Sequence, residues 1–166
     1  GRIWPEKRAD RAIKIAQRAE MKIKIAAKID NADREYTETK IEPLLDHQLV
    51  EFVGEVDRAA KQKLLGDAYA LLFPIDWPEP FGLVMVESMA CGTPVVAYRA
   101  GSVPEVIDSG LTGFIVESVD QSVEALKKIQ SLDRRLCREV FERRFSSERM
   151  AVDYLKIYEK LLTVPR

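Results

Sequence analysis

Apolar residues along the chain follow two spacings in turn. Ala9, Ala12, Ile13 and Ala16 recur at i, i+3, i+4 and i+7, which predicts an amphipathic helix after Pro5. Short apolar runs between such helical stretches predict strands. We expect these strands at 21–26, 49–53, 70–73, 95–98 and 113–116. Further helices are expected at about 34–44, 58–66 and 83–91, in a short segment from residue 103, and in a tail of three segments after residue 116.

The alternation of strands and helices predicts an α/β fold. Repeated strand-helix units give a Rossmann-like, doubly wound parallel sheet with helices on both faces, here followed by a C-terminal helical tail. A chain of 166 residues is long enough for one well-buried domain. We find no repeat, low-complexity tract or internal linker, so the pattern favours a single domain.

Charge and cysteine content narrow the class of protein. The net charge is −1 and basic residues are scattered among acids, which disfavours nucleic acid as the main partner. Cys91 and Cys137 are too few for a disulfide framework, and no Cys/His spacing indicates zinc. We therefore expect a reducing, cytoplasmic setting, with peripheral membrane association left open. No apolar run approaches 18 residues, so we predict no transmembrane segment.

Two acids mark the most informative segment. Glu79 and Glu87 are separated by seven residues, and they flank the turn between the expected strand at 70–73 and the expected helix at 83–91. In an open α/β sheet such a turn lies at the carboxyl edge, where ligands bind, and free N–H groups at the helix start suit a phosphate. The two carboxylates can hold different hydroxyls of one ligand. This arrangement suggests a nucleotide-sugar site.

The same segment resembles the Glu-x7-Glu signature of family 4 retaining glycosyltransferases with the GT-B architecture. Its context also matches, because the family's loop and strand signatures follow in the family's order. These stretches are Pro80-Phe81-Gly82, Ala90 to Ala97, Gly101 to Val106 and Gly110 to Gly113. At the other end, Gly1-Arg2 with Lys7 resembles the family's Gly-Arg-x4-Lys diphosphate clamp. The resemblance runs from residue 1 to about 116.

The resemblance implies roles for the charged residues. It makes Arg2 and Lys7 ligands of the diphosphate, although a solvated charge is the ordinary role of either residue type. It places Glu79 at the donor sugar and, together with Arg2 and Lys7, in the catalytic set. It places Glu87 at the ribose hydroxyls, a role that we favour over the alternative of an acid that merely favours the helix dipole.

The resemblance also implies backbone and pocket roles. Phe81, Gly82 and Leu83 would bind the donor through backbone N–H groups. Residues 54–56, with Gly54 and Val56 as donor-binding positions, would lie near the nucleobase; a plain strand end explains Gly54 equally well. Trp77 is expected mainly to pack. No metal and no cofactor are implied, because cationic side chains and a helix N-terminus supply the positive charge.

By resemblance, residues 1–166 are the C-terminal, nucleotide-sugar-binding domain of a GT-B enzyme, without the N-terminal acceptor domain. The implied reaction transfers a hexose from a nucleoside-diphosphate sugar, with a weak preference for UDP-glucose, to an unidentified acceptor hydroxyl with retention of configuration. This domain alone would bind and not turn over. A GT-B epimerase or phosphorylase, and a non-catalytic nucleotide-binding module, stay open as alternatives.

The chain departs from the family's pattern at three positions. Arg8 stands where glycine commonly follows the clamp lysine, Ala27 where glycine often ends a strand, and Ser102 replaces the second glycine of a pair. In the family a central first strand precedes Gly1-Arg2. We therefore expect the strands that end at Ala26 and Phe73 to flank a slot for that strand and not to pair with each other, with Arg2 emerging near Gly82.

Overall fold

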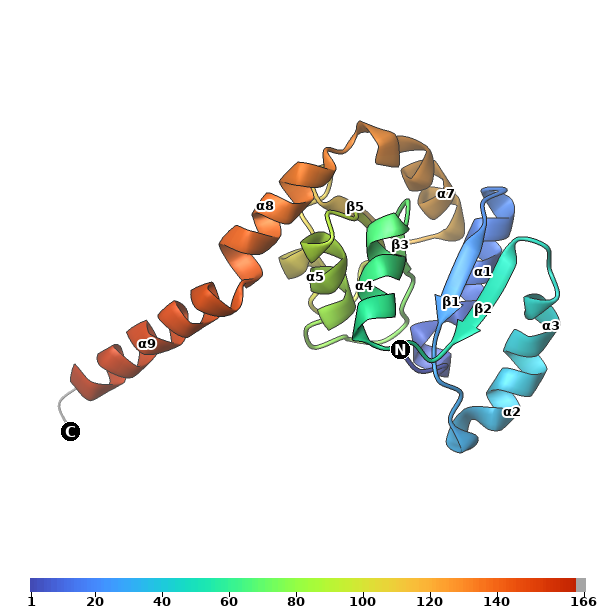
Figure 1. The fold of residues 1–166 in the computed structure, drawn as a ribbon, viewed down its shortest axis with the longest axis horizontal. Helices are drawn as coiled ribbons and strands as arrows, with labels where there is room; N and C mark the ends of the chain where they lie inside the picture. Colours follow the sequence, from blue (N-terminus) through green and yellow to red (C-terminus); the bar gives the residue numbers. More distant parts are fainter. Residues whose placement is uncertain (164–166) are drawn as a thin grey trace.

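The computed structural model describes residues 1–163 and contains two parallel sheets flanked by helices (Figure 1). The first sheet pairs β1 (Ile23–Ala26) with β2 (Val50–Gly54). The second has the order β3 (Leu71–Phe73), β4 (Val95–Tyr98) and β5 (Gly113–Val116), so β4 is central. Within the described residues β1 and β3 form no ladder with each other, as expected. The α/β class and the parallel pairing predicted from the sequence are confirmed.

Helices lie on both faces of the second sheet because alternate residues of its strands point to opposite sides. Val95 and Ala97 of β4 enter a core with α5 (Leu83–Ala90) and α8 (Arg134–Phe145). Val96 enters a second core, which α1 (Ala9–Arg18) and α7 (Val119–Lys128) cover. Because β3, β4 and β5 are parallel, the loops that follow them lie together at the carboxyl edge of the sheet.

The first sheet has its own small core. Ile3, Ala27 and Ile41 are buried there, with Ile25 and Phe52 packed against them. The expected helix at 34–44 is present but irregular: α2 (Arg34–Tyr36), a π-helical turn (Thr37–Ile41) and α3 (Glu42–Leu45) follow in succession. Pro43 lacks an N–H and cannot make a regular helical bond, which accounts for the widened turn.

The remaining elements match the expected positions closely. A 3₁₀ turn at Pro5–Lys7 precedes α1, and further 3₁₀ turns lie at Asn31–Asp33 and Ile129–Ser131. Helix α4 (Arg58–Asp67) precedes β3, and α6 (Val103–Val106) follows β4. The tail ends in α9 (Ser147–Thr163), which projects from the body and buries none of its side chains in the described structure (Figure 1).

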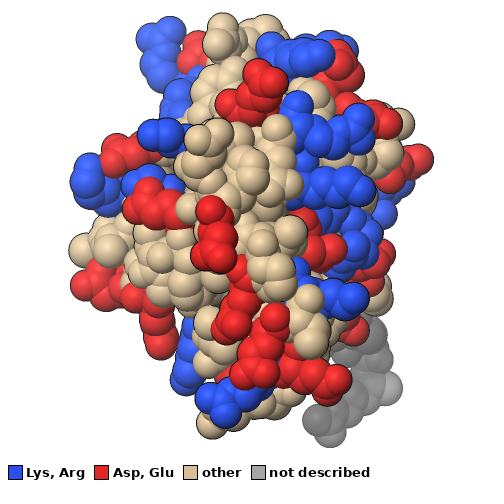
Figure 2. Space-filling model, turned by 90° about the vertical axis from the view of Figure 1, so that its right-hand side faces the viewer, with Lys and Arg blue, Asp and Glu red and all other residues tan. Residues whose placement is uncertain are grey.

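Charges of both signs are interspersed over the face shown in Figure 2, in keeping with the net charge of −1.

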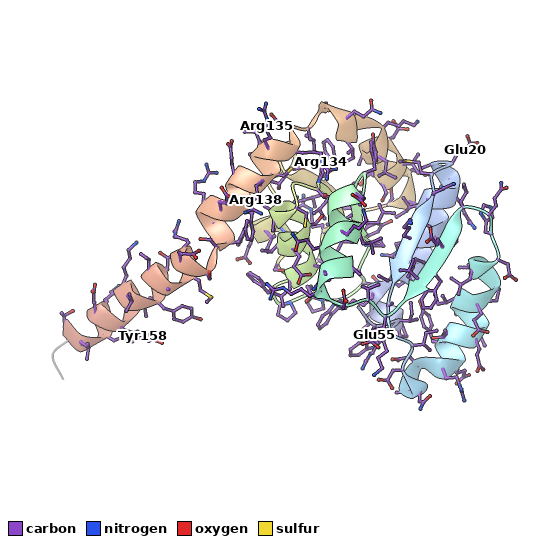
Figure 3. All side chains as sticks on the ribbon, viewed as in Figure 1. Glu20, Glu55, Arg134, Arg135, Arg138 and Tyr158 are labelled. Carbon is purple, nitrogen blue, oxygen red and sulfur yellow. The ribbon has the colours of Figure 1, made fainter. Side chains whose placement is uncertain are left out.

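Much of the arginine content of α8 is structural. Arg134 donates to the carbonyls of Ala68 and Gly66, at 2.7 and 2.8 Å, and to Thr93 Oγ1 at 2.6 Å. It thereby caps the C-terminal end of α4. Its neighbour Arg135 points outward, and its side chain is 88% exposed (Figure 3).

We predict that Arg134→Ala lowers the free energy of unfolding by about 1–3 kcal/mol, because it leaves the carbonyl groups of Ala68 and Gly66 without this donor. Arg135→Ala is the matched control on the same helix turn and should change stability by less than about 0.5 kcal/mol. Urea unfolding followed by circular dichroism measures both. Equal losses for the two variants would contradict the capping role of Arg134.

Candidate functional site

Lys7 and Glu79, which are 72 positions apart, meet in a direct ion pair. Lys7 ends the first 3₁₀ turn, and Glu79 lies in the loop between β3 and α5. Trp77 Nε1 donates to the same carboxylate oxygen at 3.2 Å, and its ring centroid lies 4.7 Å from the Lys7 ammonium. The Glu79 side chain is only 13% exposed, so two charge-assisted contacts offset its desolvation.

The loop after β4 fixes the backbone of Glu79. The Ser102 N–H donates to the Glu79 carbonyl at 2.9 Å. Gly101 has φ +52°, and a Cβ at this position would collide with the backbone of Pro78 and Glu79. The close approach of the two loops therefore requires glycine at position 101. Of the family's glycine pair, this chain thus keeps only the first glycine, Gly101. At the second position Ser102 contributes its backbone N–H.

Helix α5 begins with an uncapped turn. Gly82 occupies the N-cap position with φ +76°, and no side-chain hydrogen bond caps the helix. Leu83 is 67% exposed, and Phe81 is half-exposed with its ring packed edge-to-face on Phe145 at 6.3 Å. The first N–H groups of a helix lack intrahelical partners and favour an anion. The turn thus offers backbone donors beside Glu79, which is the role predicted for Phe81, Gly82 and Leu83.

Glu87, the second acid of the pair, contacts Lys61 Nζ of helix α4 at 2.5 Å. Sequence reasoning missed Lys61, because only the packing of α4 on α5 brings it to Glu87.

Arg2 takes different partners from Lys7. Its Nε lies 3.3 Å from Asp33 Oδ2, and its guanidinium carbon lies 4.0 Å from the centroid of the Trp4 ring. That Asp33 oxygen is buried without a hydrogen bond within residues 1–163, so the Arg2 charge compensates it. The backbone of Arg2 pairs in parallel with Lys28, just beyond the end of β1. Arg2 therefore lies at the carboxyl end of β1, and its proximity to Gly82 stays a prediction.

The predicted nucleobase residues lie at the end of β2. Gly54 pairs with Ala26 of β1 and has φ +72°, so it ends the strand in a conformation that favours glycine. Val56 follows in the loop before α4 and is half-buried. The two positions thus lie at the same carboxyl edge as Arg2. Both explanations of Gly54, as a strand end and as part of a base pocket, fit this placement.

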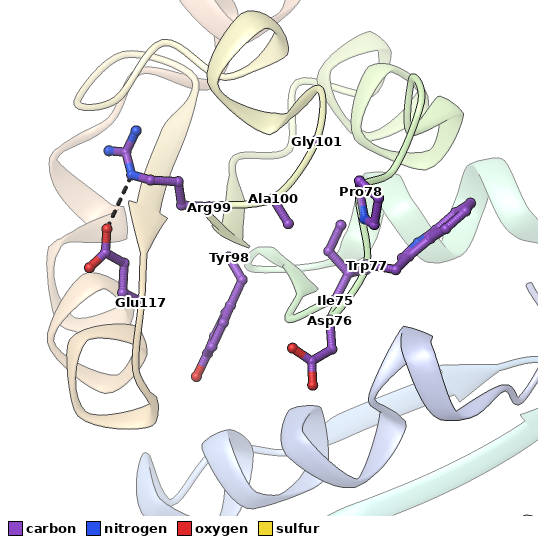
Figure 4. Close-up of a pocket in the computed structure, with 9 residues that line it drawn as sticks. All are labelled: Ile75, Asp76, Trp77, Pro78, Tyr98, Arg99, Ala100, Gly101 and Glu117. Atoms are coloured by element: carbon purple, nitrogen blue, oxygen red, sulfur yellow. Dashed lines mark hydrogen bonds and ion pairs between the residues drawn. The ribbon is translucent and has the colours of Figure 1, made fainter.

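A cavity of about 350 Å³ lies beyond the carboxyl ends of β3, β4 and β5 (Figure 4). Its charged groups are already engaged. Arg99 Nε contacts Glu117 at 3.2 Å, and Asp76 accepts from Arg8 and Arg11 at 2.8 and 3.2 Å. The start of α5, whose first N–H groups have no partner within residues 1–163, is therefore the better candidate for binding an anionic ligand.

Residues 1–163 contain neither a metal-binding cluster of side chains nor a membrane-spanning helix. No three His, Cys, Asp or Glu side chains in this part converge in a way that could bind a metal ion. No helix there combines the length and the apolar composition that crossing a bilayer requires.

Comparison with known proteins identifies the family. The sequence model described as glycosyl transferases group 1 matches residues 1–142. The chain belongs to this family. It is 38% identical over 119 residues to N-acetyl-alpha-D-glucosaminyl L-malate synthase of Bacillus anthracis. The matched stretch covers 67% of this chain and 30% of that protein. It is 29% identical over 142 residues to phosphatidyl-myo-inositol mannosyltransferase of Mycobacterium leprae, covering 81% of this chain and 37% of that protein.

Solved structures of glycosyltransferases share the fold. Sucrose-phosphate synthase from Thermosynechococcus elongatus aligns with TM-score 0.79 and 24% identity, over 98% of this chain and 44% of that one. Anabaena HepE, solved in complex with UDP and glucose, aligns with TM-score 0.77 and 23% identity, over 99% of this chain and 47% of that one. The fold is that of GT-B glycosyltransferases, as the sequence predicted. The chain spans half or less of the length of these relatives.

We predict that Trp77→Phe lowers the free energy of unfolding by about 1.5–3 kcal/mol, because the Glu79 carboxylate loses a hydrogen-bond donor in a poorly solvated position. Trp4→Phe is the matched control, since Trp4 is more exposed and stacks on Arg2. Urea unfolding followed by far-UV circular dichroism reports both without relying on tryptophan emission. A similar loss in the two variants would mean that Trp77 only packs.

Proposed function

We propose that this group 1 glycosyltransferase chain binds the donor in a retaining enzyme that transfers a hexose from a nucleoside-diphosphate sugar to an acceptor hydroxyl. The observation that carries the proposal is the Lys7–Glu79 pair beside the uncapped start of α5. A diphosphate needs a cation and N–H donors, and a sugar needs an acid that accepts from its hydroxyls. The structure brings all three groups together around Glu79: the Lys7 ammonium, the start of α5 and the Glu79 carboxylate itself.

Each charged group has a role in the proposed complex. Lys7 and the N–H groups of Leu83 and Gly82 bind the diphosphate, and Arg2 supplies a second, planar cation to it. Glu79 accepts from the hexose hydroxyls. Glu87 accepts from the ribose hydroxyls, and Lys61 orients that carboxylate from α4.

The proposed chemistry needs no protein nucleophile. The bond between the anomeric carbon and the diphosphate oxygen breaks, and the acceptor oxygen bonds to that carbon on the same face. The acceptor proton passes to the leaving diphosphate, whose charge is stabilised by Lys7, Arg2 and the start of α5. No metal ion is required in this scheme, since these groups supply the positive charge.

Several finer points belong to the proposal. The donor is a UDP-hexose, with UDP-glucose as the first candidate, and HepE, which has the same fold, was solved with UDP-glucose. The acceptor site lies on a second domain of the full-length protein, so residues 1–166 act as the C-terminal, donor-binding domain. The enzyme works in the cytoplasm, where the nucleotide donor is available.

A thermal-shift series on the full-length protein tests the proposal. UDP, UDP-glucose, GDP and GDP-mannose are compared at equal concentration, with uridine as the control that lacks phosphate. Stabilisation by a nucleoside diphosphate but not by uridine supports the donor site. Release of free monosaccharide from the donor without any acceptor would instead support an epimerase or phosphorylase.

We predict that Lys7→Ala and Arg2→Ala each weaken binding of the nucleoside diphosphate by about 1.5–3 kcal/mol, because each removes a charge-assisted contact. Uridine affinity should not change. Isothermal titration calorimetry with UDP and uridine measures both affinities. Equal losses for the two ligands would show that neither cation contacts the diphosphate.

We predict different effects for the two acids. Glu87→Gln should weaken UDP and UDP-glucose alike, because both ligands carry the ribose. Glu79→Gln should act mainly on UDP-glucose affinity and on turnover, because only the donor carries the hexose. Calorimetry with both ligands and a turnover assay separate these outcomes. If UDP affinity falls equally in the two variants, the assigned division of roles is wrong.

A further inference from the structure

Arg8, the residue after Lys7, has an unusual backbone conformation. Its φ and ψ are +54° and 51°, in the left-handed region, where it is the N-cap of α1. A residue with a Cβ avoids this region unless surrounding contacts enforce it. Contacts around Arg8 must therefore hold its backbone in this conformation.

The Arg8 guanidinium bridges two carboxylates from different segments. Nε and Nη2 donate to the two oxygens of Asp10 at 3.0 and 2.9 Å, which is a two-pronged contact. Nη1 donates to Asp76 Oδ2 at 2.8 Å. Asp10 lies in the first turn of α1, and Asp76 lies in the loop after β3. Arg8 thus ties the start of the helix to the loop that leads to Glu79.

The contacts of Arg8 and Asp10 fix the protonation states of Asp10 and Tyr36. Burial opposes ionisation of Asp10, but the hydrogen bonds and charge of Arg8 outweigh it and hold the Asp10 pKa below its usual range. Tyr36 donates its hydroxyl to Asp10 Oδ1 at 3.1 Å. Burial and the Asp10 charge raise the Tyr36 pKa to about 12. At neutral pH Asp10 is therefore a fixed acceptor between two donors.

Further bonds join the same two segments. The Asp76 N–H donates to the Glu6 carbonyl at 2.8 Å. Arg11 donates to the Pro74 carbonyl at 3.1 Å and to Asp76 at 3.2 Å. These contacts begin one residue from Lys7 and end three residues from Glu79. They link the two segments at a point where β1 and β3 share no ladder within residues 1–163.

We propose that Arg8 is a positioning residue, which sets the separation of Lys7 from Glu79 by bridging Asp10 and Asp76. The inference rests on the proposed donor site. All three nitrogen atoms of the Arg8 guanidinium are engaged by carboxylates, so Arg8 is not itself a phosphate ligand. It acts through Lys7 and through the loop that carries Glu79.

Two substitutions test this role from opposite ends of the bridge. Arg8→Gly removes the guanidinium while keeping a residue that tolerates φ +54°. Asp76→Asn changes an exposed side chain, removes its charge and weakens its contacts with Arg8 and Arg11, while every residue of α1 is kept. We expect each variant of the full-length protein to bind UDP roughly tenfold more weakly, and the double variant to lose little more than either single variant. Arg18→Ala, which breaks an exposed pair with Asp120 at the other end of α1, is the control.

The sign of the Asp76→Asn effect separates positioning from simple electrostatics. If Arg8 and Asp76 acted only through their charges, removing a negative charge would tighten UDP binding, and Arg8→Lys would behave as wild type. Tighter binding in Asp76→Asn therefore overturns the inference. So does an unchanged UDP affinity in an Arg8→Gly protein that has merely become less stable. If the wild-type protein binds UDP and GDP no better than uridine, the proposed function itself fails.

Discussion

The ion pair between Lys7 and Glu79 joins two parts of the molecule that no described β ladder joins. Lys7 follows the segment that runs beside β1, and Glu79 follows β3. The geometry of the site therefore depends on contacts between loops rather than on a shared strand register. Because the Glu79 carboxylate is mostly buried, its charge needs a cation or hydrogen-bond donors nearby in every state of the site.

This requirement couples binding of the diphosphate to binding of the sugar in the proposed donor. A diphosphate that binds Lys7 must compete with Glu79 for the ammonium group. Once displaced, the carboxylate needs new donors, and the hydroxyls of a sugar supply them. The Glu87–Lys61 pair is a second carboxylate–ammonium pair, in a more exposed position, and the proposed function places it at the ribose. On the proposed function, a ligand with both a diphosphate and a sugar gives each member of the Lys7–Glu79 pair a new partner: the diphosphate for Lys7 and the sugar hydroxyls for Glu79.

The sequence predicted the second sheet better than the first. The strands at 95–98 and 113–116 match β4 and β5 in full. The apolar run of β4 is continuous because this strand is central and both of its faces are covered. In contrast, β1 begins two residues later than predicted. Glu20, with φ +55°, reverses the chain after α1, and the Met21 N–H bonds back to Ala16. A left-handed glutamate has no signature in the hydrophobic pattern.

The site shows a similar limit. Spacing and context identified Glu79 and Glu87, because both lie on one continuous segment. Their partners were not predictable in the same way: a lysine such as Lys61 on a helix surface is solvated by default, and only tertiary packing makes it a counter-ion. Trp77 was expected mainly to pack, yet it donates to Glu79. Local sequence thus specifies where the charges of this fold lie, whereas helices and loops distant in the chain determine which charge opposes each one.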